Sequence, residues 1–253
     1  MDIAVVTGAS SGLGTEYVKQ IADMYPTLNE IWIIARRKEK LEELAKSIAA
    51  VPCRAVVCDI TDEQNVAAYK QLLTDTKANV KILINNAGFG RLNDFANIST
   101  SDNGGMVRLN CEALTIITSI TLEFMRENAQ IINVSSIASF VPNARMAVYS
   151  STKAYVTSFS RALRFELKKR RINVTAVCPG PMDTEFLPVA NIAKGTSKTF
   201  DMLPRVKVKS VARKSLIAAK RGRGMYTDRA FYKFYRFLAK IVPHSIMMYF
   251  AKT

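Results

Sequence analysis

The sequence is poor in the residues that bind zinc or build disulfide frameworks. Its 253 residues include one histidine, His244, and four cysteines, none of which forms a C-x-x-C pair. Structural zinc sites and small disulfide-linked folds need such pairs or His/Cys clusters. We therefore expect no metal site and no disulfides, and the four cysteines should be reduced and mostly buried: Cys53, Cys58, Cys111 and Cys178.

Long uncharged apolar runs are also absent. No run reaches the roughly 18 apolar residues that a membrane-spanning helix requires. The chain begins Met1-Asp2 and enters the apolar run 3–6 at once, so the basic region and cleavage site of a secretory signal are not expected. These features predict a cytoplasmic protein that contacts a membrane at most peripherally.

Acidic residues are scarce at the C-terminal end. The net charge is +15, and residues 205–253 hold 13 Lys and Arg against one acid, Asp228. The first 204 residues hold 23 basic and 20 acidic groups. The body of the protein is thus nearly balanced, while the tail carries the charge, which bears on partners more than on fold.

Apolar runs of strand length alternate with amphipathic segments of helix length. The 49% hydrophobic content is that of a globular protein. The expected strands are Ile3–Thr7, Ile31–Ala35, Ala55–Cys58, Ile82–Asn85, Ile131–Val134 and Ile172–Cys178, and the expected helices are Gly14–Met24, Lys38–Ala49, Glu63–Thr74, Asn110–Arg126, Ser151–Arg170 and Val208–Arg221, with a loop over Phe186–Pro204. This alternation predicts an α/β fold with a single doubly wound parallel sheet of the Rossmann type and helices on both faces. Residues 1–227 would form this domain, and residues 228–253 a basic, helical C-terminal extension.

A glycine-rich turn follows the first strand, in Thr7-Gly8-Ala9-Ser10-Ser11-Gly12-Leu13-Gly14. Such a turn lets the backbone approach a pyrophosphate, whose charge then lies at the N-terminus of the next helix. The second strand ends in Arg36 and Arg37, which suit the 2′-phosphate of NADP, although they could be ordinary surface arginines. Asp59, after the third strand, could contact adenine or simply cap a turn.

A phenol and an ammonium lie on one face of an expected helix, in Tyr149-Ser150-Ser151-Thr152-Lys153. A nearby cation favours the phenolate and would bring the pKa of Tyr149 down toward the working range. Upstream, Ser136 follows a strand and offers a hydroxyl that could hold a substrate oxygen.

Together these motifs resemble the short-chain dehydrogenase/reductase family over roughly residues 1–227. The family's motifs stand in order: TGxxxGxG at 7–14, Asn85-Asn86-Ala87-Gly88 after the fourth strand, Asn110 at the start of a long helix, Ser136 13 residues before Tyr149, and Pro179-Gly180 ahead of Thr184. The resemblance implies that Tyr149 exchanges the substrate proton and that Ser136 orients the substrate oxygen. It also implies that Lys153 holds the nicotinamide ribose and that Asn110 supports a water relay.

The resemblance further implies a nicotinamide dinucleotide as the cofactor, and Arg36 and Arg37 favour NADP(H). Thr184 would meet the nicotinamide carboxamide, Asn86 would stabilise the central sheet, and Ala87 and Gly88 would line the adenosine side. Ser11 stands where NADP-preferring relatives often carry a basic residue, so the preference rests on Arg36 and Arg37. The expected cofactor-binding residues are Gly8, Ser10, Ser11, Gly12, Leu13, Gly14, Arg36, Arg37, Asp59, Ile60, Asn86, Ala87, Gly88, Tyr149, Lys153, Pro179 and Thr184.

The function expected from this set is hydride transfer between nicotinamide and a carbonyl or hydroxyl carbon, as in a carbonyl reductase or alcohol dehydrogenase. The alternative is a dinucleotide-sensing module whose basic tail engages a membrane or a partner. The intact set of proton-transfer residues favours the enzyme, and the expected substrate is a small, apolar carbonyl or alcohol compound. A homodimer or homotetramer is expected to form through the helices at 110–126 and 151–170.

Aromatic and basic residues alternate in the tail, in Phe231-Tyr232-Lys233-Phe234-Tyr235-Arg236-Phe237-Leu238. Such a pattern suits an amphipathic cover over a pocket or subunit contact, a membrane surface or lipid-like substrate, or single-stranded nucleic acid. We expect the pocket cover and no nucleic-acid partner, with Pro243 breaking the tail into two short helices. Deleting residues 229–253 would then raise the Michaelis constant for apolar carbonyls and spare NADPH binding.

Overall fold

The computed structural model describes residues 1–193, 195 and 197–250. One parallel sheet of seven strands runs through them in the order β3-β2-β1-β4-β5-β6-β7. The reversal of strand order beside β1 is that of a doubly wound fold, which confirms the predicted fold class. The strands are β1 Asp2–Thr7, β2 Glu30–Ala35, β3 Cys53–Val57, β4 Asn79–Asn85, β5 Gln130–Val134, β6 Asn173–Val177 and β7 Met225–Tyr226.

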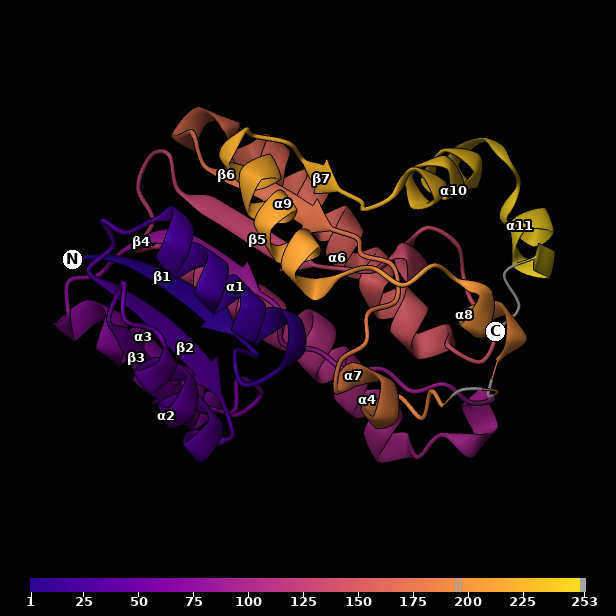
Figure 1. The fold of residues 1–253 in the computed structure, drawn as a ribbon, viewed down its shortest axis with the longest axis horizontal. Coiled ribbons are helices and arrows are strands. Elements are labelled where there is room, and N and C mark those ends of the chain that lie inside the picture. Colours follow the sequence, from indigo (N-terminus) through magenta and orange to yellow (C-terminus); the bar gives the residue numbers. More distant parts are fainter. Residues whose placement is uncertain (194, 196, 251–253) are drawn as a thin grey trace.

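Helices cover both faces of the sheet (Figure 1). On one face Ala4 and Val6 of β1 pack in a core that includes residues of α1 and α9. On the other face Ile3 and Val5 of β1 pack with residues of α3 and α5. The central strands are therefore apolar on both faces, because each face is buried. The longer helices are α1 Gly12–Met24, α2 Lys38–Ser47, α3 Glu63–Asp75, α4 Thr100–Val107, α5 Leu114–Leu122, α6 Ala147–Glu166 and α9 Val208–Lys220.

The expected helix at 110–126 is instead part of a longer, interrupted one. A π-helical segment, Arg108–Ala113, joins α4 to α5, and Asn110 lies within it. A π turn adds a residue to the helical repeat and is frequent at functional sites. Periodicity could not reveal this interruption, because α4 contains two glycines and has little apolar patterning of its own.

The segment expected as a loop, 186–204, contains two short helices, α7 Phe186–Val189 and α8 Lys198–Met202. The tail forms α10 Ala230–Ile241 and α11 His244–Phe250, interrupted at Pro243 as predicted. Figure 1 shows α8, α10 and α11 at one end of the molecule, beyond the carboxyl ends of the strands, and α7 nearer the middle beside α4. These four helices add a layer that strand-helix alternation alone does not describe.

The four cysteines are free. Cys58 and Cys178 are buried and the other two are partly buried, as expected for reduced cysteines of a packed core. None of the described helices is both long and apolar enough to cross a bilayer.

Candidate active site

A cleft of about 1370 Å³ runs along the carboxyl ends of the strands. The cofactor-binding and catalytic residues expected from the sequence line it, except Gly14 and Asn110. These two residues contact residues that do line the cleft: Gly14 packs against Gly8, and Asn110 forms a hydrogen bond with Phe89. The cleft extends from the β1–α1 turn, past Tyr149, to the aromatic residues of α10.

The β1–α1 turn leaves room for a phosphate and little room for side chains. Gly8 and Gly12 have φ values of +65° and +53°, in the left-handed region that favours glycine. A Cβ at Gly8 would lie 2.8 Å from the Cα of Ala87, and one at Gly14 would overlap the carbonyl oxygen of Gly8. The side chain of Ser11, which precedes α1, makes no capping hydrogen bond, so it does not occupy the N–H groups of the first helical turn. A helix N-terminus whose N–H groups are not occupied by a capping side chain is suited to bind a pyrophosphate.

The amide of Asn86 ties this turn to the end of β4. Its Nδ2 donates to the carbonyl oxygens of Thr7 and Gly8 at 3.2 and 3.1 Å. The Thr7 hydroxyl in turn accepts from the backbone N–H groups of Asn86 and Ala87. Asn86 thus fixes the glycine turn against the neighbouring strand end.

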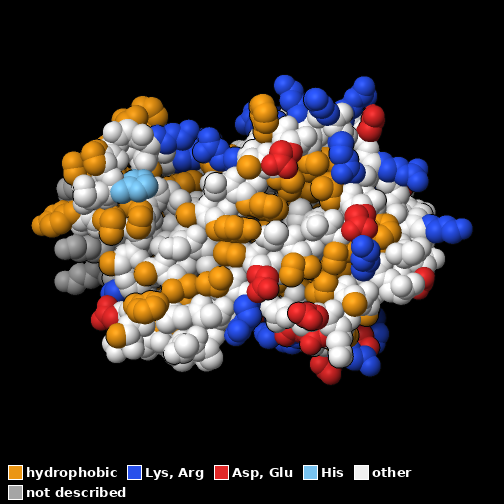
Figure 2. All heavy atoms as spheres, turned by 180° about the vertical axis from the view of Figure 1, so that it is seen from behind, with side chains coloured by type: hydrophobic (Ala, Val, Ile, Leu, Met, Phe, Trp, Pro, Cys, Tyr) orange, Lys and Arg blue, Asp and Glu red, His pale blue; other side chains and the backbone are white. Residues whose placement is uncertain are grey.

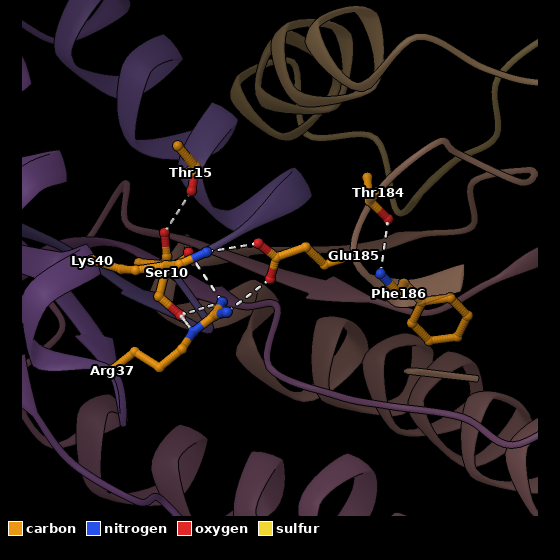
Figure 3. A network of polar contacts seen from close by, with 8 residues as sticks. Ser10, Thr15, Arg37, Lys40, Thr184, Glu185 and Phe186 are labelled. Atoms are coloured by element: carbon orange, nitrogen blue, oxygen red, sulfur yellow. Dashed lines mark hydrogen bonds and ion pairs between the residues drawn. The ribbon is translucent and has the colours of Figure 1, made fainter. Parts of the chain in front are cut away.

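A charged network lies beside the turn (Figure 3). Arg37 donates to the Ser10 hydroxyl at 3.2 Å and to Glu185 at 2.8 Å, and Lys40 donates to the other oxygen of Glu185 at 2.8 Å. These hydrogen bonds hold the pKa of Glu185 below its usual value, so its carboxylate is ionised at neutral pH. The network joins the end of β2 to the segment after β6, across the cleft.

Arg36 and Asp59 are also placed at this end of the cleft. The Arg36 side chain is 77% exposed and lies 3.6 Å from an Asp59 oxygen. Asp59 accepts hydrogen bonds from the backbone N–H and the hydroxyl of Thr61, so it does cap the turn that follows β3. Burial raises the pKa of Asp59, but these hydrogen bonds and Arg36 outweigh burial and lower it overall.

Tyr149, near the start of α6, is buried in the wall of the cleft. Burial raises the pKa of its phenol to about 12, although a hydrogen bond with Ser136 acts in the opposite direction. Ser136 follows β5, and its hydroxyl also accepts from the N–H of Ala138 at 3.1 Å. The phenol is therefore protonated at neutral pH and is hydrogen-bonded to the Ser136 hydroxyl.

Lys153 lies one helical turn beyond Tyr149 and is also buried. Its Nζ donates to the carbonyl oxygen of Val134 at 2.9 Å and lies 5.7 Å from the centre of the Tyr149 ring. Burial lowers the pKa of Lys153 to about 8. The expected lowering of the tyrosine pKa by Lys153 is thus not found here, because desolvation of the phenol dominates and the ammonium is bonded to a backbone oxygen.

Asn110 clamps the segment after β4. Its Oδ1 accepts from the N–H of Phe89 at 3.1 Å, and its Nδ2 donates to the Phe89 carbonyl at 2.9 Å and to Thr152 at 3.0 Å. A Cβ at Gly88 would lie 2.8 Å from the Asn110 Oδ1 and 3.4 Å from the Lys153 Nζ. Glycine is needed at 88 because these two side chains approach the backbone there.

The far half of the cleft is mainly aromatic and aliphatic. The Tyr149 and Phe186 rings have centroids 5.5 Å apart. Further lining residues come from α8, α10 and α11, namely Phe200, Met202, Tyr235, Leu238 and Met247. The tail thus contributes residues of α10 and α11 to the wall of the cleft, and its role in substrate binding stays a prediction.

Two residues of the charged network were not among the expected site residues, namely Lys40 and Glu185. Glu185 directly follows Thr184, which was expected to meet the nicotinamide. This position next to Thr184 was the only feature of the sequence that pointed to Glu185. Sequence cannot show that Glu185 reaches across the cleft to Arg37 and Lys40, which follow β2.

Comparison with known proteins agrees with this geometry. A family model described as short chain dehydrogenase matches residues 2–194. Sulfoacetaldehyde reductase 2 of Chromohalobacter salexigens is 33% identical over 190 residues, which are 73% of this chain and 74% of the relative. A fatty acyl-CoA reductase of Acinetobacter baylyi is 32% identical over 204 residues, which are 76% of this chain and 66% of the relative.

Solved structures extend the likeness to nearly the whole chain. A short-chain dehydrogenase from Sphingobium yanoikuyae in complex with NADPH has a TM-score of 0.82 and 25% identity, covering 98% of this chain and 95% of that one. A 3-ketoacyl-(acyl-carrier-protein) reductase from Brucella melitensis complexed with NADH has a TM-score of 0.76 and 28% identity, covering 89% and 93%. The similar structures thus include complexes with both forms of nicotinamide cofactor.

Proposed function

Because the chain belongs to the short-chain dehydrogenase family, we propose that it is an NADP(H)-dependent reductase of apolar carbonyl compounds. The observation that carries this proposal is the meeting of Tyr149, Ser136 and Lys153 in one cleft with the glycine turn and two arginines. A dinucleotide-sensing module would need the turn but not the proton-transfer residues. The complete set therefore favours an enzyme.

A bound nicotinamide would supply the hydride, and the protein's own groups manage the oxygen and the proton. The Ser136 hydroxyl, hydrogen-bonded to the phenol, is placed to hold the carbonyl oxygen beside it. Because the pKa of the phenol is about 12, it is protonated at neutral pH and can donate its proton to that oxygen. The Lys153 ammonium lies beside the phenol and would hold the ribose.

Preference for NADP(H) is proposed from the charges at the end of β2. Arg36 is largely exposed, and Arg37 reaches Ser10 at the edge of the glycine turn. A 2′-phosphate beside them would gain charge-assisted hydrogen bonds, each worth about 1.5–3 kcal/mol, or about 10- to 150-fold in affinity. Asp59 and Glu185 already pair with these arginines, so the phosphate must compete with two carboxylates.

The test is a screen of aldehydes and ketones that follows the loss of NADPH absorbance, with NADH in parallel. Turnover of apolar carbonyls with NADPH is expected. Equal or tighter binding of NADH would overturn the cofactor assignment and leave the reductase assignment standing. No turnover of any carbonyl, with tight NADPH binding, would favour the sensing module.

A homo-oligomer is part of the proposal. Among the helices expected at the subunit contact, α5 exposes Ile116, and α6 exposes Tyr155 and Phe165, the last to 82%. Tyr155 stacks on Phe159 on the same face of α6. Such an apolar surface on a monomer is a liability that subunit contact would remove.

A further inference from the structure

Helix α10 presents three different surfaces. Tyr232, Tyr235 and Leu238 line the cleft. Tyr232 is fully buried, and its hydroxyl donates to the carbonyl oxygen of Pro204 at 2.7 Å. This first surface fastens the helix to the domain, so removal of the whole tail would open the core. Point substitutions on the outer surfaces are therefore the sharper probe.

The second surface is an exposed apolar stripe. Phe231, Phe234, Phe237 and Ile241 are spaced three or four residues apart, which puts them on one side of the helix. Each is between 51% and 61% exposed. On α11, Ile246 and Met248 are exposed as well. Figure 2 shows hydrophobic side chains gathered at the end of the molecule that carries the single histidine.

The third surface is basic. Lys233 and Lys240 are exposed, and Arg236 lies between them with a hydrogen bond to Thr227. Residues 229–250 include no acid. Figure 2 shows Lys and Arg side chains beside the hydrophobic group at this end of the molecule. A cationic strip thus runs along an aromatic one on the same helix.

The apolar stripe is continuous with the mouth of the cleft. Phe231 and Phe234 belong to the stripe and also line the cleft. Val189 of α7 and Met202 of α8 likewise line the cleft while being exposed. The entrance to the substrate half is therefore bordered by apolar side chains that face outward.

We propose that α10 and α11 dock on an anionic lipid bilayer and hold the mouth of the cleft against it. An interfacial helix inserts an apolar face below the headgroups and keeps its basic side chains at their level, where each attracts anionic lipid. A symmetric contact between two copies fits this surface poorly, because Lys233 and Lys240 of both copies would approach each other and α10 and α11 carry no acid to pair with them. In this arrangement the exposed apolar stripe inserts into the apolar part of the bilayer.

The docking also names a substrate class, and this consequence rests on the proposed function. A mouth that opens on the bilayer admits a carbonyl group carried on a hydrocarbon chain directly from the membrane. The carbonyl end would reach Tyr149 and Ser136, while the chain would lie along the aromatic wall formed by α8 and α10.

Cosedimentation with vesicles tests the docking without cofactor or substrate, so its outcome is independent of turnover. Vesicles of equal parts phosphatidylglycerol and phosphatidylcholine should bind the full chain, and phosphatidylcholine alone should bind it at least about tenfold less. The variant F237S/I241S, which alters no cleft-lining residue, should lower the partition coefficient about tenfold or more. The charge reversal K233E/K240E should lower it about 25-fold or more.

Matched variants far from the tail give the controls. K19E/K46E reverses two exposed lysines on α1 and α2, and F95S removes an exposed aromatic ring before α4. Both should bind vesicles like the wild type, and thermal melts should show all four variants folded. Failure of the wild type to bind anionic vesicles, or an equal loss in K19E/K46E, would overturn the proposal. Unchanged vesicle binding by F237S/I241S with a halved mass in light scattering would assign the stripe to a second copy instead.

Discussion

The Glu185 carboxylate offers a quantitative test of the cofactor end of the site. It accepts from Arg37 and Lys40, both at 2.8 Å, and the side chains of all three residues are between 43% and 49% exposed. Ion pairs at such exposure are worth about 0.2–1 kcal/mol each. The two pairs together then cost about 0.4–2 kcal/mol to break, which is about 2- to 30-fold in a binding constant.

The substitution Glu185→Gln removes that competition and one negative charge from the region where the 2′-phosphate is proposed to bind. We expect NADPH to bind about 2- to 30-fold more tightly, with a much smaller change for NADH, which lacks the phosphate. Fluorescence titration of both cofactors measures the two constants. Glu42→Gln is the matched control, because among the described residues Glu42 forms an ion pair only with Lys38 of the same helix, and it does not line the cleft.

Two results would contradict this role of Glu185. A parallel gain for both cofactors would show that Glu185 opposes the pyrophosphate common to them and not the 2′-phosphate. Weaker binding of both would show that the contact with Arg37 and Lys40 holds the binding site together.

Three other predictions concern the catalytic end and the assembly. Gly88→Ala should lower kcat/KM at least about tenfold and stability by about 1–3 kcal/mol, because the new methyl group displaces Asn110 and approaches Lys153; a variant with normal kinetics would contradict that packing. The rate of carbonyl reduction should fall as the pH rises through about 8, because Lys153 is protonated below that pKa and neutral above it. In Lys153→Arg the remaining activity should not show this fall. A pH profile that Lys153→Arg leaves unchanged would refute the assignment of this titration to Lys153. Light scattering at micromolar concentration should give the mass of a dimer or tetramer, with Phe165→Ser shifting it toward the monomer, and a monomeric wild type would refute the subunit contact.

The fold could be predicted from the sequence because most of its strands are buried on both faces. Runs such as Ile3–Thr7 and Ile31–Ala35 are nearly all apolar, and the structure places them as neighbouring central strands. The edge strand β7 has two residues, too few for any periodic pattern. The π-helical segment Arg108–Ala113 was not predicted either, since apolar periodicity does not reveal such an interruption.

The candidate site, like the fold, could be predicted from the sequence only in part. Residues that carry motifs, such as Tyr149 and Lys153, could be named from spacing, because i and i+4 share a helix face. The pKa of Tyr149 could not, since it depends on burial, which spacing does not reveal. Glu185 was not predicted for a related reason, because its partners lie far away in the sequence. Arg37, which precedes α2, is 148 residues away, and Lys40 of α2 is 145 residues away.

NADPH-dependent carbonyl reduction by the wild type and by Tyr149→Phe decides whether Tyr149 is the proton donor. Phenylalanine keeps the ring and removes only the proton donor, so NADPH affinity should stay within about twofold while turnover falls at least about a hundredfold. A Tyr149→Phe enzyme that keeps about a tenth or more of wild-type turnover would contradict the claim that this phenol delivers the proton.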